Sequence, residues 1–199
     1  LEIKIIELRE ITGWRKPIYV KIGAARPYYD TALEVKAGAD VVVMDGMQGG
    51  TAATQDVFIE HVGIPTLAAV PEAVRALKEL GMHRTVQLIV AGGIRSGADV
   101  AKALALGADA VSIGTAALVA IGDNDPALDE EYRALGSAAG YWDQYQAGND
   151  PAGITTQDPV LASRLDPELA GRRLANYLKV LTLEAQTLAR ACGKSHVHN

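Results

Sequence analysis

The chain has 199 residues, of which 49% are hydrophobic and 22% charged, with a formal net charge of −5 at pH 7. This composition is ordinary for a globular protein, and the negative charge without a basic stripe argues against a nucleic-acid-binding surface. No apolar run approaches the roughly 20 residues of a membrane helix. The single cysteine, Cys192, excludes an internal disulfide and favours a reducing, cytoplasmic environment.

Four short apolar runs predict strands buried in a parallel sheet, and they are residues 18–22, 41–44, 86–90 and 110–113. Helices are expected between these strands and after the last one, at residues 30–37, 71–80 and 99–106 and beyond Gly114. Gly38, Gly81 and Gly107 end the first three helices. The alternation of strands and helices predicts an α/β fold.

One strand–helix–strand unit occurs twice in the sequence. Shifting residues 20–46 forward by 69 positions lays them on residues 89–115, and eight residues then meet identical partners. They are Gly23, Arg26, Asp30, Ala32, Gly38, Ala39, Asp40 and Val42. The repeat indicates one βαβ step of a wound parallel sheet.

Four strands are half of the eight in a closed (β/α)8 barrel, which takes about 250 residues. Because the chain begins at Leu1 and its last third differs in composition, we interpret residues 1–122 as the second half of such a barrel. Residues 1–9 would be the end of the preceding barrel helix. A half barrel exposes two sheet edges and an apolar face, so we expect self-association or association with the first half as a separate fragment.

Residues 123–199 are expected to form a C-terminal extension that packs on the barrel. Its first part is rich in turn-forming residues, which predicts an ordered, loop-rich excursion up to about residue 166. Pro167 then opens a helix over residues 168–191, where apolar residues recur at helical spacing.

Two consecutive strands end in glycines, at Gly92-Gly93 and at Gly114-Thr115. Glycine leaves backbone N–H groups accessible to an anion, and barrels often bind phosphate after their seventh and eighth strands. The alternative is that these glycines serve only tight turns. Two successive strand ends of this kind favour a phosphate site.

Lys21 lies inside an otherwise apolar strand, near the edge where barrel active sites form. A lysine there requires an anion or an electron-rich acceptor, although its ammonium could also reach solvent at the strand end. The equivalent residue in the repeat is Val90, which favours a functional role for Lys21.

The next strand leads into a loop of small residues, 45–54. Such a loop lets a flat ligand approach the backbone, and Gln48 and Thr51 can supply oriented hydrogen bonds. A mobile glycine lid is the alternative interpretation. Asp45 either orients Lys21 or is a structural residue at the strand end.

Together the segments 20–23, 45–53, 91–97 and 112–116 resemble the FMN-binding synthase domain of glutamate synthase large subunits. The resemblance extends through 152–159 and 172–177, and it is strongest to stand-alone glutamate-synthase-like subunits such as the flavin subunit of N-methylglutamate synthase. It implies an FMN barrel that reduces 2-iminoglutarate, or its N-methyl counterpart, formed from 2-oxoglutarate and ammonia or methylamine. It also implies glutaminase-like and electron-donor subunits as partners.

By this resemblance Lys21 meets the N1/O2 edge of the flavin and stabilises the reduced ring. The FMN phosphate is held by Gly92, Gly93, Gly114 and Thr115, with Arg95 supporting the loop. Gly49, Gly50 and Thr51 line the flavin and substrate, and Gln48 contacts a carboxylate of 2-oxoglutarate. Residues 1–199 alone are expected to hold FMN weakly and to be inactive, because the first half of the barrel supplies the remaining contacts.

The chain departs from the family at the cysteines of an iron–sulfur cluster, where it has Ala139, Tyr145 and Asp150. Without thiolates no cluster is expected in this chain, and Cys192, His196 and His198 at the chain end are not expected to bind a metal. Two alternatives remain open. One is a non-catalytic flavin-binding structural subunit, and the other is an IMP-dehydrogenase-like barrel, which needs a cysteine nucleophile that the loop 46–54 lacks.

Overall fold

The computed structural model describes residues 1–49 and 54–197, which divide into two compact units. The first unit contains residues 1–113 and 183–199, and the second contains residues 114–182. The division into barrel and extension at residue 122 stays a prediction.

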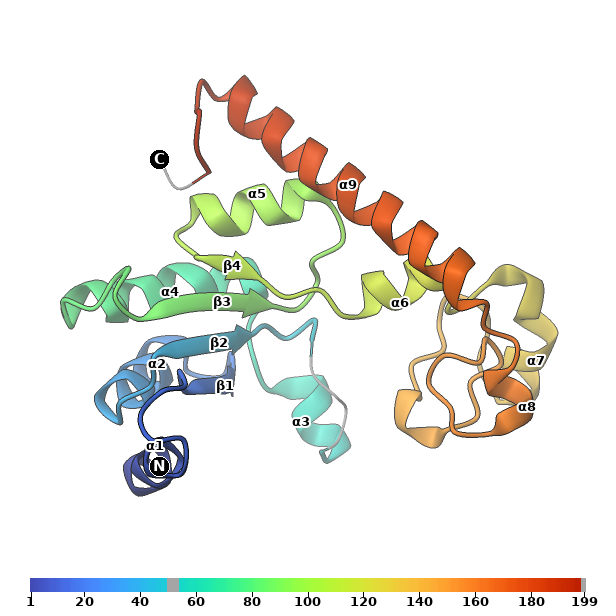
Figure 1. Ribbon diagram of the computed structural model, residues 1–199, viewed down its shortest axis with the longest axis horizontal. Helices are drawn as coiled ribbons and strands as arrows, with labels where there is room; N and C mark the ends of the chain where they lie inside the picture. Colours follow the sequence, from blue (N-terminus) through green and yellow to red (C-terminus); the bar gives the residue numbers. More distant parts are fainter. Residues whose placement is uncertain (50–53, 198–199) are drawn as a thin grey trace. The chain divides into compact units, whose positions relative to one another are not determined.

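Four strands form one parallel sheet in the first unit, in the order β1-β2-β3-β4. They are β1 (Tyr19–Gly23), β2 (Val41–Asp45), β3 (Gln87–Ala91) and β4 (Ala110–Val111). The helices of this unit are α1 (Glu2–Ile11), α2 (Pro27–Lys36), α3 (Asp56–His61), α4 (Thr66–Glu79) and α5 (Gly97–Ala105). The carboxyl ends of the strands lie at one edge of the sheet (Figure 1), so the predicted parallel α/β arrangement is confirmed.

Three helix starts differ from the prediction. Helix α2 begins at Pro27 and not at Asp30, because a proline suits the first position of a helix. Helix α4 begins at Thr66 and not at Pro71, because Pro65 is the residue that precedes the helix in extended backbone, while Pro71 lies inside it. Helix α5 is capped by Ser96, whose side chain accepts a hydrogen bond from the Asp99 N–H in a reciprocal capping box. Helix α3 was not predicted.

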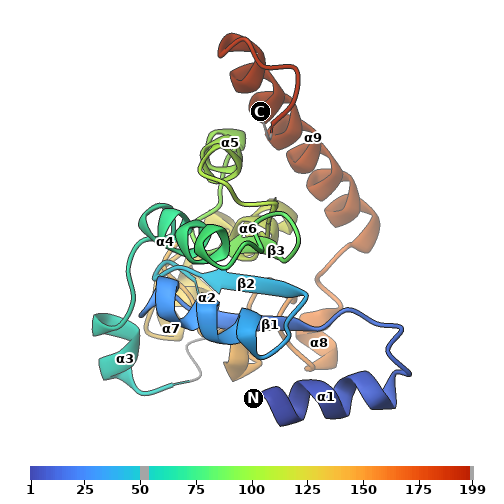
Figure 2. The same cartoon turned by 90° about the vertical axis from the view of Figure 1, so that its left-hand side faces the viewer.

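The two faces of the sheet differ in what covers them. Since side chains alternate across a strand, the register partners Ile22, Met44 and Val90 share one face, where they join the core formed with α4. Figures 1 and 2 show α2 and α4 running along the sheet. The opposite face carries the register partners Lys21, Val43 and Ile89, none of them buried. This is the face that would line the interior of a closed barrel.

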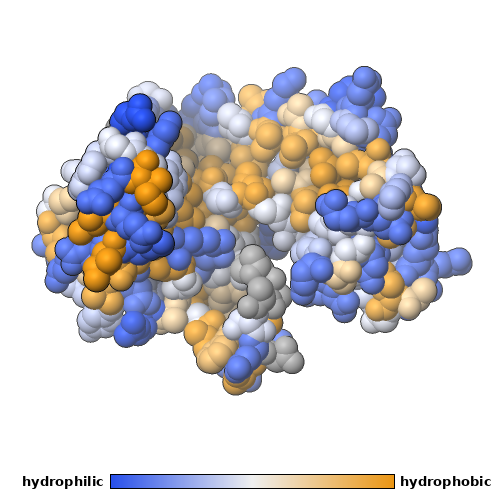
Figure 3. All heavy atoms as spheres, turned by 60° about the horizontal axis from the view of Figure 1, so that its bottom comes forward, coloured by the Kyte–Doolittle hydropathy of each residue, from blue (hydrophilic) through white to orange (hydrophobic). Residues whose placement is uncertain are grey.

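Apolar side chains are also exposed away from the sheet. Ile3 and Ile11 of α1 and Phe58 of α3 are 83%, 73% and 49% exposed. Figure 3 shows such hydrophobic surface beside hydrophilic residues. Within the parts of the chain that the structure describes, β1 and β4 each pair with a strand on one side only. These exposed features match what half a barrel requires.

The second unit begins with α6 (Thr115–Ile121), followed by η1 (Pro126–Leu128), α7 (Asp129–Ala134), η2 (Tyr145–Ala147) and α8 (Pro159–Ala162). Helix α9 (Pro167–Ala191) starts in this unit and ends in the first. Long loops between short helices confirm the predicted excursion, and α9 confirms the predicted C-terminal helix. Among the described residues, no helix is long and apolar enough to cross a membrane.

The internal repeat is visible in the hydrogen bonds of the first unit. Asp40 accepts a hydrogen bond from the Ile18 N–H at 2.7 Å and pairs with Arg9 at 2.9 Å. Its repeat equivalent, Asp109, accepts one from the Leu88 N–H at 2.8 Å and pairs with Arg84. In both copies, a carboxylate directly before one strand accepts a hydrogen bond from the backbone at the neighbouring strand, and this bond joins the two strands.

We predict that Asp40 makes the stability of the protein pH-dependent. Burial alone would raise the pKa of Asp40, but hydrogen bonds from Arg9 and the Ile18 N–H lower it below its ordinary value. A carboxyl with a lowered pKa stabilises the fold above its unfolded pKa of about 3.9, and this contribution is lost as the pH falls through the folded pKa. Urea unfolding should show Asp40→Asn losing about 1 kcal/mol at pH 7 and much less at pH 3.

Glu7→Gln is the matched control, because Glu7 forms an exposed ion pair with Lys4 at 3.0 Å. It should change the unfolding free energy by less than about 0.5 kcal/mol. Equal losses for Asp40→Asn at pH 7 and pH 3 would contradict the electrostatic role.

Candidate functional site

Lys21 and Asp45 form an ion pair at the carboxyl edge of the sheet. The Lys21 Nζ lies 2.9 Å from the Asp45 Oδ2, and the side chains are 55% and 10% exposed, respectively. The pair forms across neighbouring strands, where Lys21 is two residues before the register partner of Asp45. Asp45 therefore anchors one side of the ammonium, while more than half of the lysine side chain is exposed at the sheet face.

The Gln48 side chain has a defined orientation. Its Oε1 accepts a hydrogen bond from the Thr66 backbone N–H at 3.0 Å. Because an N–H can only donate, the amide oxygen must face Thr66, and the Nε2 group is left as a donor toward other partners. The side chain also lies against Gly93, where an added Cβ would come within 3.2 Å of the Gln48 Cβ.

Thr66 connects three segments of this site and was not identified from the sequence. It is 3% exposed, and its hydroxyl lies 2.8 Å from the Gly92 carbonyl oxygen and 3.0 Å from the Gln48 Oε1. A Cβ added to Gly46 or Gly92 would collide with the Thr66 side chain. The available signal was a hydroxyl residue directly after Pro65, at the start of a helix.

Gly49 is a glycine because of its neighbours. A Cβ at this position would collide with the Asp45 carboxylate and lie 3.0 Å from the Gly92 Cα. Its N–H donates to the Gly46 carbonyl at 2.9 Å, which turns the loop back toward β2. The structure thus brings Gln48, Gly49, Gly92 and Gly93 together, whereas Gly50 and Thr51 lie outside the described residues.

Gly92 and Gly93 present backbone donors at the end of β3. Their φ angles are +99° and +72°, a region that favours glycine. Within the described parts of the chain, neither N–H donates a hydrogen bond to the protein. These two amides are therefore available to an anion.

The start of α5, in contrast, is already satisfied by the protein. Asp99 accepts hydrogen bonds from the N–H groups of Arg95 and Ser96, and the Glu184 carboxylate accepts one from Gly97 at 2.6 Å. The Arg95 side chain is 81% exposed and its Nε lies 3.9 Å from Asp99. The role of the Arg95 side chain in supporting the phosphate loop stays a prediction.

Gly114 and Thr115 belong to the second unit, at the start of α6. Gly114 precedes the helix without a side-chain cap, and a Cβ there would meet nothing within 4 Å. The first N–H groups of a helix lack partners within the helix. The Thr115 side chain interacts with Tyr145, whose pKa is raised by burial and by the nearby Asp123 carboxylate.

The residues at the cluster positions form a polar and aromatic core. Asp150 is completely buried, and its carboxylate accepts hydrogen bonds of 2.9 Å from the N–H groups of Ala152, Ile154 and Thr155. The Tyr145 ring lies 5.3 Å from that of Trp142. Ala139 offers no ligand atom in its side chain. This donor set does not fit an iron–sulfur cluster, which requires thiolates.

A second buried carboxyl lies in the same core. Burial raises the pKa of Asp123, and the negative charge of Asp150 adds to the effect. Burial likewise raises the pKa of Tyr132 to about 12. The Tyr132 hydroxyl accepts a hydrogen bond from the Asn124 N–H at 3.0 Å. The core is thus built from uncharged hydroxyls and backbone-bonded carboxyls.

Of the chain-end ligands considered above, His198 lies outside the described residues.

Several solved structures are similar in fold to this chain. A mutant flavocytochrome b2 with pyruvate bound covers 99% of this chain and 35% of its own length, with a TM-score of 0.60 and 20% identity. A mandelate oxidase variant with 2-hydroxy-phenylacetamide covers 92% and 37%, with a TM-score of 0.54 and 22% identity. These likenesses show the fold, and the four strands with their helices are part of a (β/α)8 barrel.

The chain belongs to the family of the conserved region in glutamate synthase, whose model matches residues 1–125 and 144–195. It is 78% identical over 199 residues to a glutamate synthase large subunit-like protein of Rhizobium meliloti (strain 1021). It is 42% identical over 193 residues to an archaeal glutamate synthase (NADPH) of Methanocaldococcus jannaschii. The predicted family is therefore confirmed.

The chain spans less than half the length of the curated relatives it matches. The match to the Rhizobium protein spans 100% of this chain and 45% of that protein. The match to the archaeal protein spans 96% of this chain and 35% of that protein.

We predict that the Thr66 hydroxyl holds the Gln48 and Gly92 segments together. Thr66→Val keeps the side-chain shape but leaves the Gly92 carbonyl without its side-chain donor, which should lower the free energy of unfolding by about 1–3 kcal/mol. Thr66→Ser retains the hydroxyl and should lose distinctly less. Urea unfolding of both variants measures the difference, and an equal loss would show that the methyl group, not the hydroxyl, matters.

Proposed function

We propose that this chain is part of an FMN-dependent oxidoreductase of the glutamate synthase type. The proposed reaction is the reduction of 2-iminoglutarate, or of its N-methyl counterpart, formed from 2-oxoglutarate and ammonia or methylamine. The observation that carries the proposal is the half-exposed Lys21 ammonium anchored by buried Asp45, beside an oriented Gln48 amide and two free glycine amides. The family supports the same reaction class.

The residues present fit FMN. Gly92 and Gly93 offer N–H groups without protein partners, and their positive φ angles suit only glycine at low cost. Gly114 leaves open space where a side chain would stand, ahead of the uncapped α6. We propose that Gly92, Gly93, Gly114 and Thr115 hold the phosphate. When bound, FMN would supply the electrons for reduction.

Lys21 would stabilise negative charge on the flavin at its N1/O2 edge. A cation on a rigid strand is well placed for this, because it needs no rearrangement when charge develops. Asp45 restrains the ammonium through the 2.9 Å ion pair. The geometry therefore favours Lys21 as a fixed electrostatic partner and not as an acid that is consumed.

Gln48 would bind a carboxylate of the 2-oxoglutarate-derived substrate. With its oxygen bonded to Thr66, the amide can offer only its NH2 group, which is the complement of a carboxylate. Gly49, Gly50 and Thr51 would line the flavin and the substrate beside it.

Electrons would reach the flavin from outside this chain. Ala139, Tyr145 and Asp150 supply no thiolates for a cluster, so we propose an electron-donor subunit or a diffusing reductant. A glutaminase-like subunit is the proposed ammonia source. Homo-oligomerisation, or association with the other half of the barrel, would cover the exposed sheet face.

A second candidate function is a flavin-binding structural subunit without turnover, and the missing cluster thiolates favour it. The IMP-dehydrogenase-like alternative has no such support, since Cys192 follows α9 and lies far along the chain from the loop 46–54. Steady-state turnover by the full-length protein with 2-oxoglutarate and either amine distinguishes the two remaining functions. Bound FMN without turnover would favour the structural subunit.

We predict that Lys21→Met in the full-length protein lowers FMN retention or flavin reduction at least tenfold, because the charge facing the flavin is lost. The variant also leaves the Asp45 carboxylate unpaired, which destabilises the fold. The double variant Lys21→Met/Asp45→Asn should recover the melting temperature but not turnover. Flavin absorbance and thermal unfolding measure the two effects separately.

Lys102→Met on α5 serves as the matched control, since Lys102 is an exposed lysine of the same unit. It should leave flavin content and turnover unchanged. Recovery of turnover in the double variant would sink the proposed role of Lys21.

We also predict that Gln48→Glu raises the KM for 2-oxoglutarate at least tenfold with little change in the melting temperature. A glutamate still accepts the hydrogen bond from Thr66, but it replaces the amide donor by a negative charge that repels a carboxylate. Initial-rate kinetics check this, and an unchanged KM would show that Gln48 does not contact the substrate.

A further inference from the structure

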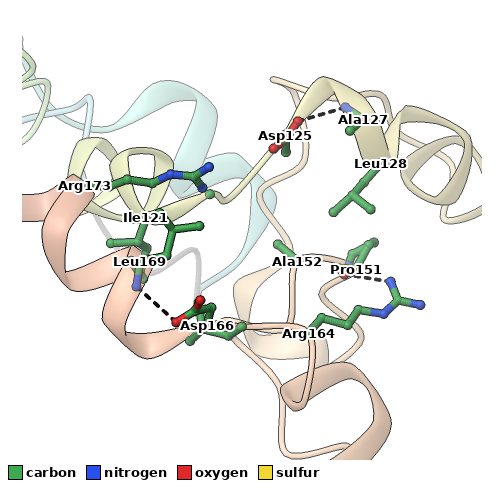
Figure 4. Close-up of a pocket in the computed structure, with 13 residues that line it drawn as sticks. Ile121, Asp125, Ala127, Leu128, Pro151, Ala152, Arg164, Asp166, Leu169 and Arg173 are labelled. Carbon is green, nitrogen blue, oxygen red and sulfur yellow. Dashed lines mark hydrogen bonds between the residues drawn. The ribbon is translucent and has the colours of Figure 1, made fainter.

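The second unit contains a cavity of about 240 Å³ that none of the proposed flavin residues line. Its wall is formed by α6, η1, the loop at Pro151, the turn before α9 and the first turns of α9. Most of the lining is apolar, including Ile121, Leu128 and Leu169, and Figure 4 shows their side chains around the cavity. At roughly 30 Å³ per water, the volume equals about eight waters.

Three of the four charged residues that line the cavity are already engaged. The Asp125 carboxylate caps η1 through the Ala127 N–H at 2.9 Å, and Asp166 caps α9 through two N–H groups at 3.0 and 3.1 Å. The Arg164 guanidinium is 2.7 Å from Glu131 and 2.8 Å from the Pro151 carbonyl. Their charges and hydrogen bonds are therefore used in building the wall.

Arg173 is the remaining charged residue. Its guanidinium lies beside Gly122 at the end of α6, 3.5 Å from the position of an added Cβ. Among the residues that the structure describes, Arg173 has no carboxylate partner. Figure 4 shows it extending from α9 at the cavity. The adjacent Arg172, in contrast, lies 3.9 Å from Glu168.

We propose that this cavity binds a small monocarboxylate with an apolar body. The guanidinium of Arg173 matches a carboxylate in two parallel hydrogen bonds, and the apolar wall buries the rest of the ligand. A dianion is disfavoured, because Asp125 and Asp166 also line the cavity and would repel its second charge. The proposal is independent of the flavin chemistry.

The test is a titration of the full-length protein with isovalerate, followed by calorimetry or by saturation-transfer NMR. Isovaleramide, a neutral compound of nearly the same shape, is the ligand control. Isovalerate should bind saturably at millimolar concentrations, and isovaleramide at least tenfold more weakly. Equal binding of the two compounds would overturn the proposal, and so would the absence of saturable isovalerate binding, as when another part of the longer protein fills the cavity.

Arg173→Gln should weaken isovalerate binding at least tenfold, whereas Arg172→Gln, the matched control, should leave it within twofold. Ala152→Leu fills the cavity from another wall without changing its charge, and it should also abolish binding. Thermal unfolding establishes that each variant is folded. An equal effect of Arg172→Gln, or unchanged binding in Ala152→Leu, would place the ligand elsewhere and overturn the proposal.

Discussion

The close approach of backbone segments around Thr66 is the constraint on which the candidate site depends. Gly46 and Gly92 leave room for the Thr66 side chain, and its hydroxyl and N–H then bond to Gly92 and Gln48. Further backbone hydrogen bonds, from Gly46 to Ala91 at 2.9 Å and from Met47 to Ile64 at 3.0 Å, continue past the strand ends. Each contributes only about 0.5–1.5 kcal/mol, but together they fix loops that otherwise have many conformations.

This rigidity holds the Lys21–Asp45 ion pair in one arrangement. A surface ion pair contributes little to stability, but here one partner is 10% exposed and packed against Gly49. Asp45 cannot turn away without opening that contact. The Lys21 ammonium is therefore held in a defined position on the sheet face. Asp45 and Gly49, which restrain it, belong to the same segment as Gln48.

The sequence was sufficient for the four parallel strands, because each strand is an apolar run and the repeat relates the first two strands to the last two. It was sufficient to single out Lys21, Gln48 and the glycine pairs, whose residue types stand out locally. Thr66 escaped notice because its partners are 18 and 26 residues away and belong to other strand ends. Helix α3 was not predicted either, since its six residues are too few to show a periodic apolar face.

Gly49 shows that a loop glycine in the sequence does not identify what it contacts. A glycine in a loop beside a predicted ligand suggests contact with that ligand, yet the structure shows that Asp45 alone already excludes a side chain there. A glycine pattern thus identifies where backbone comes close to something, but not to what.

The second unit folds around buried polar and aromatic residues in the segment where the resemblance would place cluster cysteines. The family match omits residues 126–143, and this stretch supplies Tyr132 and Trp142, which are 0% and 2% exposed. Asp150 meanwhile fixes the following turn through three backbone N–H groups, as a cluster ligand would fix it by coordination. Because the aromatic pair fills the core and the carboxylate shapes the turn, this loop has its own means of folding without a metal. Under the proposed function, electrons then come from outside this chain, and the strand ends that carry Lys21 and Gly92 keep the residues that the proposed flavin site needs.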